Sequence, residues 1–265
     1  MIIRNVFMKT LYDKRWFVFG WTLGLMALTA LMVTFYPAMH QDGSLEQLTK
    51  SMPPAFQGLV GNLDNLSRFS TYLASQLFDI RMQIIAGVMA IILALGISIS
   101  EEENGQLRSL TALPISRTAI VVQKWLAMVV ILSVTVLGTM VGILLFQMMI
   151  NESIDLGELA RLIFMTWILL IALGSITFAA AMASGIRSVA SSVGILVLAV
   201  SFIVTTFSVG VDWLKDFESF SIFYFFPAVD IVKEGIQLRD VSVLIGISVV
   251  SLVVTLIFFR RRDIR

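Results

Sequence analysis

The sequence has 265 residues, of which 58% are hydrophobic and 14% are charged, whereas a soluble domain carries about 25% charged residues. Its apolar residues come in blocks of the roughly 20 residues that a helix needs to cross a bilayer, so we expect an all-α polytopic membrane protein with about six transmembrane helices. The net charge of +1 gives no reason to expect nucleic acid as a partner, and the lack of cysteine and the single histidine exclude disulfides, thiolate metal sites and mechanisms that need two imidazoles.

The first 16 residues predict an amphipathic helix that lies in the membrane interface. Ile3, Phe7 and Leu11 recur every four residues and share one helix face, while Arg4 lies elsewhere. A solvated tail with a few apolar residues is the alternative.

Six apolar stretches follow, and we treat residues 1–265 as a single transmembrane domain. The expected spans are about 17–39, 82–99, 126–150, 162–184, 189–211 and 241–259, with external loops at 40–81, 151–161 and 212–240. Within the last loop, the apolar run from Phe220 to Val229 is too short to cross a membrane. It predicts either a re-entrant segment that dips into the membrane and returns, or a surface loop with buried aromatic residues.

Basic residues are more numerous on the side of the membrane that holds both chain ends. That side carries Arg4, Lys9, Lys14, Arg15, Arg108, Arg117, Lys124, Arg187, Arg260, Arg261, Arg262 and Arg265. The other side, with much longer loops, carries Lys50, Arg68, Arg81, Arg161, Lys215, Lys233 and Arg239. The positive-inside rule therefore predicts a multi-pass protein of the cell membrane with both termini in the cytoplasm.

Motifs for nucleotide, metal or hydrolytic chemistry are absent from the sequence. It has neither Gly-x-x-x-x-Gly-Lys-Ser/Thr nor Gly-x-Gly-x-x-Gly, and His40 stands alone at the outer end of the first span. We therefore expect no catalytic, cofactor or metal site in this chain and no enzyme activity of its own. The expected spans also hold almost no ionisable side chains, which argues against a secondary carrier because intramembrane charges mark ion paths.

Small residues at four-residue spacing occur in two of the expected spans. Gly20 and Gly24 lie in the first, and Gly138 and Gly142 lie in the third. Such pairs let helices approach closely. They predict packing within one bundle or, through the first span, a dimer.

The segment from Glu101 to Arg117, which we call the island, is polar and charged and lies between two long apolar runs. Gly105 permits a sharp turn after three acids, because glycine has no Cβ. The residues that follow predict a short helix with Leu107, Leu110 and Leu113 on one face and Arg108 beside them.

Two residues end this short helix and begin the next one. Pro114 ends it, because the residue before a proline is pushed out of the α region. Ser116 is suited to be the N-cap of a second helix that runs through Lys124. A short helix with an apolar stripe and a basic flank, held at a membrane surface, can dock into a groove on another protein.

The six-span layout and the island together resemble the permease subunit of ABC-2-type ATP-binding cassette transporters. In that family the loop after the second span carries acids, a glycine, a leucine-rich short helix and a Leu-Pro-x-Ser-Arg run. The matching residues here are Glu101, Glu102, Glu103, Gly105, Leu107 to Leu113, and Leu113-Pro-Ile-Ser-Arg117. The resemblance implies that residues 101–124 form a cytoplasmic coupling segment whose short helix inserts into a separate ATPase subunit.

The resemblance also implies roles for the island residues and a set of partners. The three leucines would fill a groove of the ATPase, Arg108 and Arg117 would pair with acids at its rim, the three glutamates would pair with bases, and Pro114 would fix the corner. ATP and Mg would be bound by that partner, and a second membrane subunit, either another copy or a homologue, would complete the complex in the lipid bilayer. Export is expected over import; the alternatives are a membrane anchor or sensor without transport activity, and a secondary carrier.

Overall fold

A computed structural model describes residues 5–41, 68–99 and 116–261, and the regular elements in these ranges are all helical. The long helices are α2 (Arg15–Gln41), α6 (Gln83–Ser98), α9 (Arg117–Gln147), α10 (Leu156–Ser184), α11 (Arg187–Phe207) and α14 (Leu238–Arg261). The short ones are α1 (Val6–Asp13), α5 (Phe69–Leu73), the π-helical η1 (Ala74–Met82), α12 (Asp212–Lys215), the 3-10 turns η2 (Glu218–Phe220) and η3 (Phe223–Phe225), and α13 (Ala228–Lys233).

Six helices among the described residues are long and apolar enough to cross a membrane. They are Arg15–Ala38, Phe69–Ser98, Arg117–Gln147, Leu156–Ser184, Arg187–Phe207 and Leu238–Arg260. The expected all-α polytopic fold is therefore confirmed. Most of these helices extend beyond the expected spans at their polar ends, where apolar composition alone underestimates helix length.

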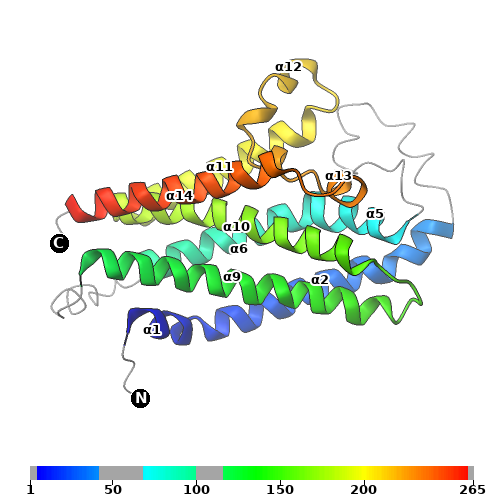
Figure 1. Ribbon diagram of the computed structural model, residues 1–265, viewed down its shortest axis with the longest axis horizontal. Coiled ribbons are helices and arrows are strands. Elements are labelled where there is room, and N and C mark those ends of the chain that lie inside the picture. Colours follow the sequence, from blue (N-terminus) through cyan, green and yellow to red (C-terminus); the bar gives the residue numbers. More distant parts are fainter. Residues whose placement is uncertain (1–4, 42–67, 100–115, 262–265) are drawn as a thin grey trace.

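Helix α10 is the centre of the bundle. Of its most apolar stretch 83% is buried, against 22% for α14, and α10 contacts α6, α9, α11 and α14. A helix that is apolar on every side can be surrounded by protein or by lipid, and α10 is surrounded by the other helices. Helix α2 packs along α9, at the outside of the bundle (Figure 1).

Both ends of the described chain lie at one end of the bundle. In Figure 1 the start of α1, the end of α6, the start of α9 and the end of α14 all lie on the left. We call this the island end, because the island joins α6 to α9, and the opposite end the far end. An even number of crossings places the chain ends together in this way.

The second span begins earlier than predicted, because α5, η1 and α6 form one helical stretch from Phe69 to Ser98. Residues 69–81 therefore belong to this span and not to the expected external loop 40–81. The polar side chains that interrupt the apolar pattern here are satisfied inside the protein. Arg81 donates to the backbone carbonyl and the side chain of Gln76, within η1.

The longer helices also correct the expectation that the spans hold almost no ionisable groups. Asp79 and Arg81 lie in the second span and Lys124 lies in the third. Asp79 accepts a hydrogen bond from the backbone of Ala228, and Lys124 donates to a backbone carbonyl. Each of these groups has a partner within the chain, as intramembrane charges generally require.

The segment from Phe220 to Val229 begins at the last residue of η2, contains the 3-10 turn η3 and runs into the start of α13. Ile222, Phe223 and Phe226 are buried, and the backbone N–H of Ile222 donates to Ser201 Oγ of α11 at 3.2 Å. Gln83 Nε2 donates to the carbonyl of Phe226 at 3.4 Å. These two bonds fix the segment to α6 and α11. The burial of its aromatic residues is compatible with a re-entrant segment and with a surface loop, so the choice between them stays open.

The two glycine pairs have different surroundings. A Cβ added at Gly138 would collide with Thr22, and one at Gly142 would lie 3.4 Å from Met26 Cγ. Gly138 and Gly142 therefore allow α9 to approach α2 within one bundle. A Cβ added at Gly20 or Gly24 would meet nothing within 4 Å, so close packing in this chain does not require these two glycines.

Candidate functional site

Two of the predicted island residues, Ser116 and Arg117, lie among the described residues. The others lie outside them: Glu101, Glu102, Glu103, Gly105, Leu107, Arg108, Leu110, Leu113 and Pro114. The predicted short helix from Gln106 to Leu113 falls in the same part of the chain. The structure shows instead how the two flanks of the island are held, at the end of α6 and at the start of α9.

Helix α9 begins with the predicted cap. Ser116 has an extended backbone (φ −66°, ψ 144°), and its Oγ accepts a hydrogen bond from the N–H of Ala119 at 3.2 Å. This geometry satisfies one of the backbone donors that a helix start leaves unpaired. The helix does not end near Lys124, as predicted, but continues to Gln147. The island therefore leads directly into the third span.

Arg117 joins the start of α9 to the end of α14. Its Nη1 donates to the carbonyls of Phe259 at 3.5 Å and Arg260 at 3.4 Å. The Arg260 side chain in turn donates to Thr118 Oγ1 at 3.0 Å from Nη2. A cation near the carbonyl end of a helix is favourable because of the helix dipole. The predicted pairing of Arg117 with an acid of a partner stays a prediction, and the structure places its guanidinium on α14.

Lys124 is a positioning residue that the sequence patterns did not identify. Its side chain is fully buried, and Nζ donates to the carbonyl of Ile97 in the last turn of α6 at 2.9 Å. It thereby connects the two spans that flank the island. A signal was available, because Ile120 and Met128 lie four residues to either side on the same helix face, and both are buried.

Lys14, at the junction of α1 and α2, approaches the same end of α6. A Cβ added at Gly96 would lie 2.6 Å from Lys14 Nζ. The two lysines therefore place positive charge beside the carbonyl end of α6, where the helix dipole favours cations.

Helix α1 also contacts α9. The N–H of Phe7 donates to Gln123 Oε1 at 3.2 Å, and Val6 is buried. Asn5 caps this helix by accepting from the N–H of Met8 at 2.8 Å. The predicted helix at the start of the chain is present from Val6 to Asp13, and its place in the membrane interface stays a prediction.

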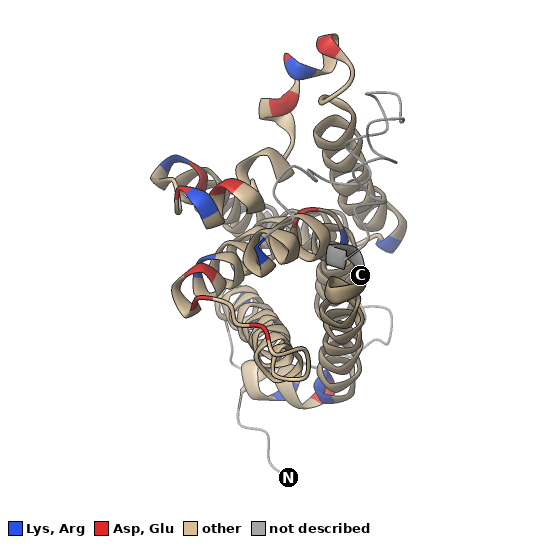
Figure 2. Ribbon diagram, turned by 90° about the vertical axis from the view of Figure 1, so that its right-hand side faces the viewer, with Lys and Arg blue, Asp and Glu red and all other residues tan. Residues whose placement is uncertain are grey.

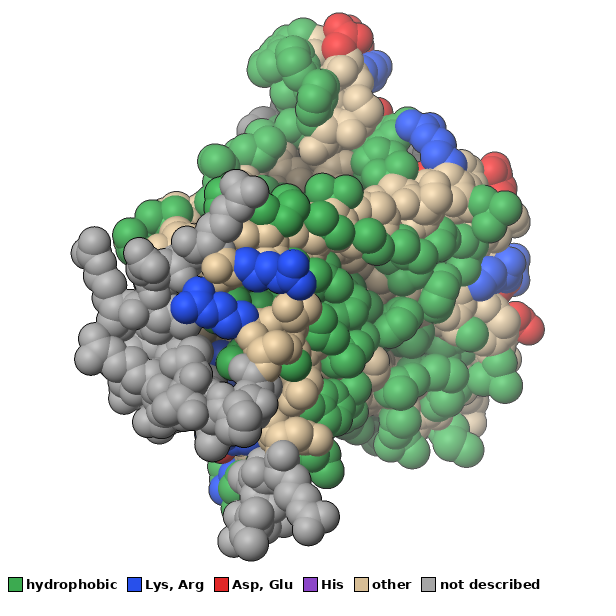
Figure 3. Space-filling model, turned by 60° about the vertical axis from the view of Figure 1, so that its left-hand side comes forward, with side chains coloured by type: hydrophobic (Ala, Val, Ile, Leu, Met, Phe, Trp, Pro, Cys, Tyr) green, Lys and Arg blue, Asp and Glu red, His purple; other side chains and the backbone are tan. Residues whose placement is uncertain are grey.

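Positive charge dominates the island end. Asp13 is the one acid among the charged residues described there; the others are Lys9, Lys14, Arg15, Arg117, Lys124, Arg187 and Arg260. Figure 3 shows basic side chains on this face beside a broad hydrophobic surface. The sequence-based orientation rests on these same residues and stays a prediction.

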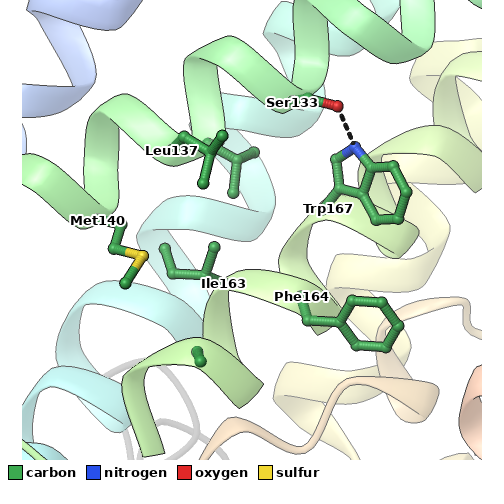
Figure 4. A pocket seen from close by; sticks show the side chains of 8 residues that line it. Ser133, Leu137, Met140, Ile163, Phe164 and Trp167 are labelled. Carbon is green, nitrogen blue, oxygen red and sulfur yellow. Dashed lines mark hydrogen bonds between the residues drawn. The ribbon is translucent and has the colours of Figure 1, made fainter. Parts of the chain in front are cut away.

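An apolar groove of about 360 Å³ lies between α9 and α10. Ser133, Val136, Leu137, Met140, Ala160, Ile163, Phe164 and Trp167 line it. The indole N–H of Trp167 donates to Ser133 Oγ at 2.9 Å (Figure 4). The groove can therefore hold an apolar group, and the indole N–H in its lining is already bonded to Ser133.

These helices define an all-α, multi-pass membrane protein built as one bundle around α10, with the island flanks braced at one end. The chain belongs to the ABC-2 family of transporter proteins, since residues 2–264 match that family. It is thus the permease, or membrane subunit, of an ABC transporter. A comparison with curated proteins gave no match.

Proposed function

We propose that this permease exports its substrate and is driven by a separate cytoplasmic ATPase that docks on the island. The observation that carries the proposal is the bracing of both island flanks. The last turn of α6 is held by Lys124, and the first turn of α9 is held to α14 through Arg117. A force applied to the island would therefore reach three of the spans.

The geometry supports a lever-like coupling between the island and the bundle. Helices α6 and α9 are joined by the bond from the Lys124 side chain to the Ile97 carbonyl, so the two helices would move together. Helix α6 packs on the central helix α10. Movement of the island would thus be transmitted to the core of the bundle, because packed helices shift as rigid elements.

The proposed complex contains two membrane subunits and two ATPase subunits in the cell membrane. Both termini and the island would face the cytoplasm, and the ATPases would bind ATP and Mg. The translocation path would lie between the two membrane subunits, because the described core of one bundle is mostly apolar. The second subunit would be another copy of this chain or a homologue.

A pull-down in mild detergent tests the proposal. The tagged protein is expected to retain a protein that carries the Gly-x-x-x-x-Gly-Lys-Ser/Thr motif. A variant with Arg108→Glu and Leu110→Asp should lose it, because the charge reversal and the buried carboxylate both oppose docking. The matched control replaces exposed residues of α12 and η2, Lys215→Glu and Phe220→Asp, and should retain the partner.

Three results would count against the proposal. Equal retention by the island variant would show that the island is not the docking site. Binding of an ATPase without substrate-stimulated ATP hydrolysis would favour a non-transporting anchor or sensor. Transport that depends on a proton gradient and not on ATP would favour a secondary carrier.

A further inference from the structure

A polar cavity of about 290 Å³ lies at the far end, away from the island. It is lined by Tyr36, Arg68, Phe69, Ser70, Glu152, Ser153, Asp155 and Glu158. These residues come from the end of α2, the start of α5, the connection from α9 to α10 and the first turn of α10. Acidic residues are numerous on the ribbon at this end (Figure 2), in contrast to the basic island end.

The charge of the cavity is negative. Three carboxylates line it, and Arg68 is the one basic residue among its lining. Arg68 Nη2 pairs with Glu158 Oε1 at 3.1 Å, and the Arg68 side chain is 68% exposed. The lining therefore keeps an excess of negative charge after this pair is formed.

Glu158 is the residue that points to a ligand. It is only 9% exposed, and its second carboxylate oxygen, Oε2, is buried without a hydrogen-bond partner among the described residues. A buried carboxylate oxygen without a donor is costly. By contrast, Asp155 has a structural task, because its Oδ1 accepts from the N–H of Glu158 at 3.0 Å and caps α10.

The lining favours an organic ammonium group over a metal ion. Among the described residues, no group of three or more His, Cys, Asp or Glu side chains could hold a metal ion. Two aromatic rings line the cavity, those of Tyr36 and Phe69, with centroids 5.1 Å apart. Aromatic faces attract ammonium groups, and a primary ammonium also has the N–H donors that Oε2 lacks.

We propose that this cavity binds a primary ammonium group of a small ligand, which pairs with the Glu158 carboxylate and lies beside Tyr36. The volume is at the lower limit for a ligand pocket and suits a compact group. Tyr36 lies near the end of the first span (Arg15–Ala38), at the level where lipid headgroups meet aromatic side chains. The ammonium can therefore come from a free amine or from an ethanolamine lipid.

The test uses the purified full-length protein in nanodiscs of phosphatidylcholine, without an ATPase. Titration with ethanolamine is expected to raise the unfolding temperature in a saturable way, whereas choline, which has no N–H, should not. Glu158→Gln should weaken binding at least about tenfold, which corresponds to 1.4 kcal/mol. Glu152→Gln, at an exposed position of the lining, should weaken it less, and Glu234→Gln, an exposed acid outside the lining, should leave it unchanged.

A second arm replaces part of the phosphatidylcholine by phosphatidylethanolamine. Stabilisation by this lipid that depends on Glu158, with or without a response to free ethanolamine, supports the site and identifies the lipid as a source. An equal response to choline, or an unchanged response in Glu158→Gln and Glu152→Gln, would overturn the proposal, as would no response in either arm. Since no ATPase takes part, this result is independent of whether the island docks one.

Discussion

Replacing Lys124 with methionine is expected to lower both the stability of the permease and the substrate-stimulated ATP hydrolysis of its complex. The change removes the donor to the Ile97 carbonyl, and a buried acceptor left without a partner costs about 1–3 kcal/mol. Methionine fills a similar volume, so the lost hydrogen bond and charge dominate the effect. The unfolding temperature in detergent should fall by several degrees.

The same variant separates docking from coupling. The island leucines are unchanged, so the ATPase should still co-purify, but its substrate-stimulated hydrolysis should fall several-fold because α6 and α9 are no longer tied. Lys215→Met is the matched control, since Lys215 is exposed and pairs with Asp212 within α12 rather than with another span. Normal stability and hydrolysis in Lys124→Met would show that the bond to α6 has no role in coupling.

Replacing Gly194 with valine is expected to cause the greatest loss of folded protein. Gly194 lies on α11 where it meets α10 and α6, and an added Cβ would lie 2.6 Å from Thr177 Oγ1 and 3.1 Å from Ile91 Cγ1. Overpacking of this kind costs typically 1–3 kcal/mol or more. Because α10 is the centre of the bundle, the separation of α11 from it should reduce the monodisperse fraction in size-exclusion chromatography.

Gly246→Val is the control for this prediction. Gly246 lies on α14, and a Cβ added there would meet nothing within 4 Å. Both changes introduce the same β-branched residue into a helix, so the intrinsic helix propensity changes equally. If the two variants give the same chromatographic profile, the close approach of α11 to α10 is not what limits folding.

Much of the fold could be predicted from the sequence because the membrane imposes a simple rule on helix length and composition. The six spans and the shared side of the chain ends follow from that rule. The start of the second span does not, because Gln76, Asp79 and Arg81 interrupt the apolar pattern. Arg81 bonds to Gln76 within η1, at a spacing of five residues that the α-helical period does not bring together. Asp79 bonds to the backbone of Ala228 in α13, and a contact between segments so far apart in the sequence leaves no local periodic signal.

Among the functional residues, too, those with a local sequence signal could be predicted and those that depend on distant contacts could not. Ser116 was predicted as an N-cap because capping is local, and the structure confirms it. Lys124 and Glu158 were missed as site residues because their roles depend on other helices, on the carbonyl of Ile97 and on a cavity shared by three elements. The island itself was recognised through its acids, glycine, leucines and proline, which form a local pattern.

Site-specific photocrosslinking tests the central claim most directly. A photoreactive residue at position 110 of the island should form an adduct with the ATPase in native membranes. The same residue at position 220, which is exposed in η2, should form none. The proposed coupling predicts an adduct at position 110 alone, and an ATPase adduct at position 220 with none at position 110 would contradict it.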